Sequence, residues 1–142
     1  MKKLICIPLI FLLISCSKHE EPGDVIFSEF ERIVSVITKD TWEVDSFLEN
    51  GTDFTMEFEE LVFNFDENGN FSAESGSNTI SGNWEYKSLP FEGELFQIDG
   101  GVQVPGNKLS QLWEIKSVIN KEVVLEFSRN DIHKKVIFKR LQ

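Results

Sequence analysis

The chain has 142 residues, and its 24 aspartate and glutamate residues outnumber the 14 lysine and arginine residues, which gives a formal net charge of −10. A chain this acidic repels the phosphates of nucleic acids and the anionic surface of a membrane, so neither is expected as an electrostatic partner. The two cysteines, Cys6 and Cys16, both lie near the N-terminus, which leaves the rest of the chain without a disulfide, a cysteine nucleophile or a cysteine-ligated metal.

The N-terminus has the pattern of a secretory signal peptide. Lys2 and Lys3 precede an apolar run, residues 4–14, that is interrupted by Pro8. The run is too short to cross a bilayer, because a membrane-spanning helix needs about 20 apolar residues. It ends in Leu13-Ile14-Ser15-Cys16, which resembles the lipobox of bacterial lipoproteins, where the signal is cut before a cysteine that carries lipid. The alternative is an ordinary signal peptide followed by an incidental cysteine.

This resemblance divides the chain into a signal peptide (1–15), a lipidated Cys16 with its tether (16–23) and a folded domain (24–142). The signal carries two lysines and no acid, so its removal takes the formal charge from −10 to −12. Lipid, rather than charge, is then expected to hold the protein at the membrane. Residues 17–21 resemble the short acidic signals that send some lipoproteins to the cell surface, although a solvated spacer has the same composition. We expect a cell-envelope protein anchored by lipid to the outer membrane, at its periplasmic face or at the cell surface.

The first element of the folded domain is predicted to be an amphipathic helix over residues 25–38. Asp24 suits the N-cap position, where its carboxylate accepts hydrogen bonds from the first turn. The apolar residues follow at helical spacing and form one stripe. They are Ile26, Phe30, Ile33, Val34 and Ile37. Such a stripe is expected to pack on the core of the same chain, over one opening of a barrel or against its outer wall.

From Thr41 onward, apolar and polar residues alternate with a period of two, which predicts β-strands. Eight such segments lie around 42–48, 61–65, 71–73, 80–86, 96–98, 113–117, 123–127 and 136–138. On the expected inward face, the first segment carries Trp42, Val44, Ser46 and Leu48, and the sixth carries Trp113, Ile115 and Ser117. Short antiparallel strands joined by turn residues suit an up-and-down sheet closed on itself, since closure leaves no exposed edge. The predicted fold is therefore mainly β, an eight-stranded antiparallel barrel with one N-terminal helix.

Charge gives a further reason to expect closure. If the last strand pairs with the first, basic residues fall beside acidic ones and stabilise the pairing. The basic residues are His133, Lys135, Lys139 and Arg140, and the acidic ones are Glu43, Asp45 and Glu49.

The domain resembles the small lipocalin-like lipoproteins of bacteria with two membranes. The resemblance rests on the lipobox, on a helix leading into Thr41-Trp42-Glu43-Val44, and on turn glycines and core aromatics over residues 41–140. The segments concerned are Asp53-Phe54-Thr55, Phe63-Asn64-Phe65, the Gly69 turn, Gly82-Asn83-Trp84 and Trp113-Glu114-Ile115. The resemblance implies an eight-stranded cup that holds at most a small apolar molecule, and it supplies no catalytic residues.

Little in the sequence indicates catalysis, a cofactor or a metal. The two histidines are His19 and His133, and neither is expected beside a nucleophile. Asp66-Glu67-Asn68-Gly69-Asn70 is similar to the start of a calcium loop. However, Phe71 stands where that loop needs glycine and Ser77 where it needs glutamate, so a hairpin turn is expected. Acid pairs for glycoside hydrolysis are available, but acids this common usually form a solvated face. These acids are Glu57, Glu59, Glu60, Glu92 and Glu94.

The candidate ligand-binding residues are aromatic and lie on the expected inward face of the strands. They are Phe63, Phe65, Trp84, Tyr86, Phe96 and Trp113. An eight-stranded barrel encloses room for its own side chains or for one small ligand. Two functions follow: a non-enzymatic lipoprotein that holds a small apolar ligand in the cup, or one with a solid barrel that meets another envelope protein. The aromatic volume favours the solid barrel, and Gly82 beside Trp84 is expected to let a neighbouring element pack closely.

Overall fold

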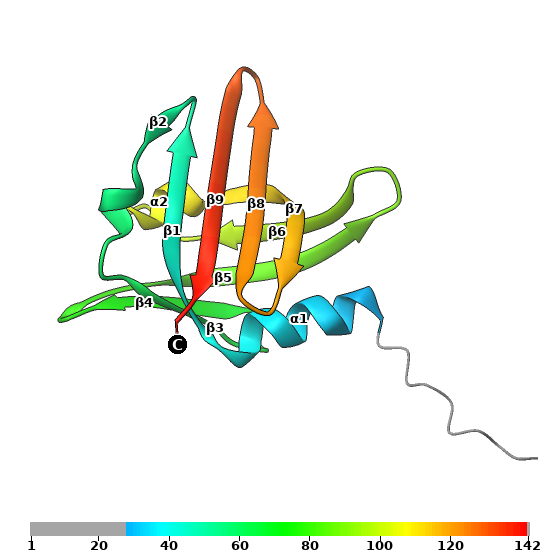
Figure 1. Ribbon diagram of the computed structural model, residues 1–142, viewed down its shortest axis with the longest axis horizontal. Helices are drawn as coiled ribbons and strands as arrows, with labels where there is room; N and C mark the ends of the chain where they lie inside the picture. Colours follow the sequence, from blue (N-terminus) through cyan, green and yellow to red (C-terminus); the bar gives the residue numbers. More distant parts are fainter. Residues whose placement is uncertain (1–27, 142) are drawn as a thin grey trace, which may run out of the picture.

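The computed structural model describes residues 28–141 (Figure 1). The predicted signal peptide, Cys16, the tether and Asp24 lie outside these residues. Among residues 28–141, no helix is both long enough and apolar enough to cross a membrane.

The described chain folds into one antiparallel sheet that closes on itself. Its strands are β1 Thr41–Glu49, β2 Thr52–Asp53, β3 Val62–Phe65, β4 Asn70–Ser75, β5 Asn78–Leu89, β6 Gly93–Asp99, β7 Gln111–Ile119, β8 Glu122–Arg129 and β9 Ile132–Arg140. The sheet order is β2-β1-β3-β4-β5-β6-β7-β8-β9, and β9 also pairs with β1. Eight strands thus form a closed barrel, and the two-residue strand β2 pairs antiparallel with the end of β1. The predicted fold class is confirmed.

Two β-bulges change which residues face the barrel interior. The register shifts between Val44 and Ser46 in β1, so that Phe47 is fully buried and Leu48 lies in a less buried position. The sequence-based assignment of Ser46 and Leu48 to the inward face is therefore wrong. An extra residue in one strand reverses the alternation beyond it.

The second bulge has the same effect in β7. The register shifts between Ile115 and Ser117, and Val118 is buried where the alternation predicted Ser117. The shift in β7 thus replaces a serine with an apolar residue at the inward position, whereas the shift in β1 places Phe47 inward instead of Ser46 and Leu48.

Helix α1 spans Glu29–Lys39, and it begins later than the sequence analysis predicted. Ser28 is the N-cap: its hydroxyl accepts from the backbone N–H of Glu31, while the Glu31 carboxylate accepts from the backbone N–H of Ser28. This reciprocal capping box satisfies two donors that a helix start leaves open. On the predicted stripe, Ile33 and Ile37 are buried, whereas Phe30 is 50% exposed.

α1 covers one opening of the barrel, below the ends of β7 and β8 in Figure 1. Ile37 lines a small cavity of the interior together with Trp42, Phe65 and Phe138. The indole N–H of Trp42 donates to the carbonyl of Ile37 at 2.9 Å, and Arg32 donates to the carbonyl of Val118 at 2.9 Å. Helix α1 therefore covers this opening with its apolar stripe and is held there by two hydrogen bonds.

Two short helices close the other opening: η1, a 3₁₀-helix at Thr55–Phe58, and α2 at Gly106–Leu109. Phe58 and Leu109 are buried there. The Phe58 ring stacks on Phe47 with 4.9 Å between centroids, and the indole N–H of Trp113 donates to the carbonyl of Leu109 at 2.9 Å. Neither helix was predicted, because segments this short show no periodicity.

Basic residues of β9 lie beside acidic residues at the closure, as predicted, but the partners differ in part. Lys139 pairs with Asp45 at 2.7 Å, and Lys134 reaches Glu49 at 3.6 Å. Lys135 instead pairs with Glu126 of β8 at 3.3 Å. Each pair is partly exposed, so each contributes modestly to the free energy of folding, about 0–1 kcal/mol.

Candidate functional site

The predicted ligand-binding residues form much of the core. Phe63, Phe65, Trp84 and Phe96 are buried in one aromatic cluster. The Phe65 ring lies at its centre, with centroids 6.1 Å from Trp84 and 5.7 Å from Phe96. Phe138 also contacts this cluster, at 5.9 Å from Phe65. Most of these pairs have tilted or edge-to-face geometry, the arrangement that aromatic rings prefer.

The other two predicted residues are the neighbours of Phe96 in the sheet, because Phe96 of β6 pairs with Tyr86 of β5 and with Trp113 of β7. Trp113 is fully buried near the opposite opening, 6.3 Å from Phe47 and 6.4 Å from Phe127. Tyr86 is only partly buried and packs 5.2 Å from Phe30 of α1. The structure therefore brings five of the candidates together in the buried core and places Tyr86 at its edge.

The barrel interior is filled. Between Ile37, Trp42, Phe65, Phe96 and their neighbours lies a cavity with a volume of about 10 Å³. A single water needs at least about 10–15 Å³, and a small-molecule site has about 300–1,000 Å³. In this conformation the six aromatic residues act as packing, and no ligand-sized space lies between them.

Each tryptophan indole N–H has a hydrogen-bond acceptor within the protein itself. Besides the bonds of Trp42 and Trp113 to helix carbonyls, the N–H of Trp84 donates to the carbonyl of Asp66 at 3.0 Å. No polar or charged residue is buried among the described residues. A buried tryptophan needs a partner for its N–H, and here each partner ties a strand to a turn or a helix that covers the core.

A well-formed surface cleft lies where β1 and β3 separate. The two strands pair through Thr41↔Asn64 and Trp42↔Phe63. Farther along β1, bonding on this side resumes at Phe47, whose N–H donates to Thr55 Oγ1 and whose carbonyl accepts from the N–H of Phe54. Between these points lies a cleft of about 270 Å³, which we call the η1 cleft.

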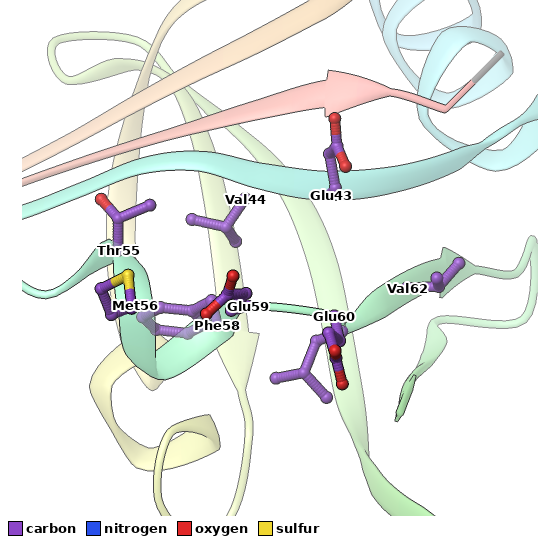
Figure 2. Close-up of a pocket in the computed structure, with 9 residues that line it drawn as sticks. Glu43, Val44, Thr55, Met56, Phe58, Glu59, Glu60 and Val62 are labelled. Carbon is purple, nitrogen blue, oxygen red and sulfur yellow. The ribbon is translucent and has the colours of Figure 1, made fainter. Parts of the chain in front are cut away.

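The η1 cleft combines an apolar floor with an acidic rim. Val44, Phe58 and Leu61 are buried and form the floor. The rim carries three exposed carboxylates and two exposed apolar side chains (Figure 2). They are Glu43, Glu59, Glu60, Met56 and Val62. Met56 is 78% exposed, and Glu60 has a φ of 65°, a left-handed conformation that costs a non-glycine residue about 1–2 kcal/mol.

The η1 cleft continues into a second hollow on the other side of η1. This hollow, of about 610 Å³, shares Glu59 and Leu61 with the η1 cleft and is bounded by Val104 and Pro105. Glu57 of η1 pairs with Lys108 of α2 at 3.5 Å, which fixes η1 against α2. The helix η1 is therefore a ridge between two hollows.

The sequence analysis missed this site. It considered Glu57, Glu59 and Glu60 only as candidates for acid-pair catalysis. The signal in the sequence was Met56, an apolar residue close to three glutamates. The cleft itself depends on where β1 separates from β3, which the alternation of residues does not reveal.

The predicted hairpin turn is confirmed at Asp66–Gly69, between the paired strands β3 and β4. Asp66 Oδ1 accepts from the backbone N–H groups of Asn68 at 2.8 Å and Asn70 at 2.9 Å. Hydrogen bonds from the Asn70 side chain, and then from these N–H groups, lower the pKa of Asp66. No group of three or more histidine, cysteine, aspartate and glutamate side chains gathers at metal-binding distance within residues 28–141.

One histidine does lie beside a hydroxyl, contrary to the sequence analysis. His133 Nδ1 is 2.8 Å from Ser128 Oγ across the β8–β9 hairpin. Both residues are exposed, and no acid bonds to the imidazole in the described part of the chain. The pair therefore lacks the orienting third group of a catalytic triad.

These features define a closed, eight-stranded antiparallel barrel with a filled core and helices over both openings. No protein-family model matches the chain, and no curated protein matches its sequence. Among solved structures, the chain is similar to the crystal structure of a DUF4847 family protein from Bacteroides vulgatus. The TM-score is 0.48 and the sequence identity 11%, over 74% of this chain and 94% of that chain. A likeness this distant assigns no function.

Proposed function

We propose that this chain is a non-enzymatic, lipid-anchored protein of the cell envelope, held at the outer membrane by Cys16, whose solid barrel supports a surface for another envelope protein. The observation that carries the solid-barrel part is the interior cavity of about 10 Å³. A barrel filled by its own aromatic side chains acts through its surface. The lipid anchor rests on the N-terminal sequence.

The other function expected from the sequence is a small apolar ligand inside the barrel. It requires α1 to leave its opening or several core aromatics to change rotamer, because Ile37 and Phe65 occupy the space. Titration with a saturated fatty acid, followed by the intrinsic fluorescence of the tryptophans, tests this directly. The proposal expects no saturable change. A saturable response at one ligand per chain would overturn the solid-barrel function.

The anchor is tested by Cys16→Ala in cells. The variant is expected to lose processing before residue 16 and to leave the membrane fraction. Ser17→Ala is a matched control that keeps the cysteine and should fractionate like the unmodified protein. If Cys16→Ala is still cut at that position and still sediments with membranes, the anchor is not a lipid on this cysteine.

A further inference from the structure

We propose that the η1 cleft is a docking site for a basic protein, and that it receives the side chain of an arginine or lysine from this partner. The proposal rests on the proposed function, since it names the surface and the chemistry through which a solid barrel would act.

The cleft has the shape and polarity that a long cationic side chain requires. Arginine and lysine bury an aliphatic stem along apolar surface while the charged end stays in water. Val44 and Leu61 provide apolar floor for such a stem. The exposed carboxylates of Glu59 and Glu60 lie beside the cleft, where the charged end would lie, and the exposed Glu43 carboxylate projects from β1 toward β9 (Figure 2). At about 270 Å³, the cleft is below the usual range for a drug-sized ligand, about 300–1,000 Å³, but it has room for one side chain.

Within residues 28–141, the carboxylates of Glu59 and Glu60 take part in no ion pair, whereas Glu43 lies opposite Lys139 in the paired strands β1 and β9. Lys139 acts on Glu43 through space, but it is bonded to Asp45 at 2.7 Å. The local charge is therefore negative, and it has the same sign as the net charge of −10 of the whole chain. Such a field increases the association rate of a basic partner.

The ridge beside the cleft provides the apolar contact that a protein partner needs. Met56 is 78% exposed on η1, and Val104 is 63% exposed across the second hollow. Methionine is common on surfaces that adapt to a partner, because its side chain is flexible and polarisable. A small free cation would leave this ridge uncovered, and for this reason we favour a protein as the occupant.

Another groove is less suited to a basic partner. It lies on the outer wall of the barrel, between Phe91 at the β5–β6 tip and Leu112 of β7. Its rim carries Arg129 together with Glu92 and Glu114. The mixed charges give no preference for a cation, so this groove is the natural negative control.

The test uses the ¹⁵N-labelled full chain in a mild detergent and a hexapeptide that alternates arginine and valine. The control peptide carries citrulline, a neutral analogue, in place of each arginine. We expect the arginine peptide to shift the backbone resonances of Glu43, Met56 and Val62, and to do so more weakly as salt increases, since exposed charges are screened. The citrulline peptide is expected to leave them unchanged.

Matched variants separate the cleft from the overall charge. Removal of two rim carboxylates in Glu59→Gln/Glu60→Gln should weaken peptide binding about tenfold. The double variant Glu67→Gln/Glu92→Gln loses the same charge at other exposed positions and should bind within about twofold of the unmodified chain. Met56→Ser should also weaken binding, because it removes apolar contact from the ridge.

Several outcomes would overturn the proposal: no saturable shifts, shifts centred on Phe91 and Leu112, or equal weakening by both double variants. Spermine that binds as tightly as the peptide, with the same sensitivity to the variants, would replace the protein partner with a small polycation. The peptide experiment does not depend on Cys16 or on the barrel interior. A failure here therefore leaves the proposed function standing, and a failure of the anchor or of the solid barrel appears only in the tests given for them.

Discussion

At the scale of single residues, three tryptophans show how this small barrel is held closed. Trp42 and Trp113 each donate an indole hydrogen bond to a helix that covers an opening, and Trp84 donates to the β3–β4 turn. Each side chain therefore contributes apolar volume to the core and also fixes a covering segment. The inward direction of Trp84 and Trp113 was predicted from strand alternation and is confirmed by their burial.

Trp113→Ala is expected to destabilise the fold by about 3–5 kcal/mol, because it leaves a large cavity and removes the bond to Leu109. Thermal unfolding of the variant measures this loss. Trp113→Phe, which keeps most of the volume, should cost clearly less. A loss near zero for Trp113→Ala would mean that the indole does not fill the core.

Gly82→Ala is expected to destabilise the fold although it adds only one methyl group. A Cβ at this position would lie 2.0 Å from the carbonyl oxygen of Asp99 and 2.7 Å from Phe71. The close approach expected from the sequence at Gly82 is thus present. Overpacking typically costs about 1–3 kcal/mol, and chemical denaturation of the variant measures it. Ser81→Ala on the same strand is the control, and equal midpoints for both variants would contradict the close contact.

At the scale of elements, alternation found all eight strands of the barrel because each has one buried and one solvated face. It did not find the bulges in β1 and β7, because a bulge is a change in backbone pairing and no residue type in these strands indicates one. Phe47 was consequently assigned to the outward face, and Ser117 rather than Val118 was expected on the inward face. The start of α1 was misplaced because both Asp24 and Ser28 are good N-caps. Glu31, three residues after Ser28, was the signal that distinguishes them.

Ser28→Ala is expected to destabilise the protein by about 1 kcal/mol, because it removes the hydroxyl of the capping box. Hydrogen exchange of the first-turn amides of α1 should accelerate more than that of the strands. Ser35→Ala, within the same helix and away from its end, is the control. Unchanged exchange in Ser28→Ala would show that the cap does not hold the helix start.

Because of Asp66 in the β3–β4 turn, the free energy of unfolding is expected to depend on pH in the acidic range. Hydrogen bonds lower the pKa of Asp66 in the folded state, so folding favours the ionised carboxylate. Its contribution is complete above the unfolded aspartate pKa, about 4, and is lost as the pH falls through the lower folded value. The melting temperature of Asp66→Asn should therefore decrease less between pH 5 and pH 2 (about the range where aspartate titrates) than that of the unmodified protein. Parallel curves would exclude Asp66 as a source of this dependence.

At the scale of the whole molecule, the closure of the barrel and the filling of its interior depend on different features of the sequence. Closure was predictable, because paired charges on the first and last strands and the need to protect edges both favour it. The aromatic volume favoured a solid body over an open cup, but the alternation along the strands does not show how the interior is packed. That depends on how Phe65, Trp84 and Phe96 interdigitate with Ile37 of the covering helix, which no pattern along one strand reports. The η1 cleft escaped prediction for the same reason, since it exists only where two strands diverge in space.

The filled interior is the central claim, and mass spectrometry of the protein extracted from cell envelopes tests it most directly. The mass of the gently ionised, folded protein is compared with the mass of the same sample after unfolding. The structure predicts equal masses, because a cavity of about 10 Å³ retains no ligand. A fixed mass difference that disappears on unfolding, at one equivalent per chain, would show a bound small molecule and would contradict the solid barrel.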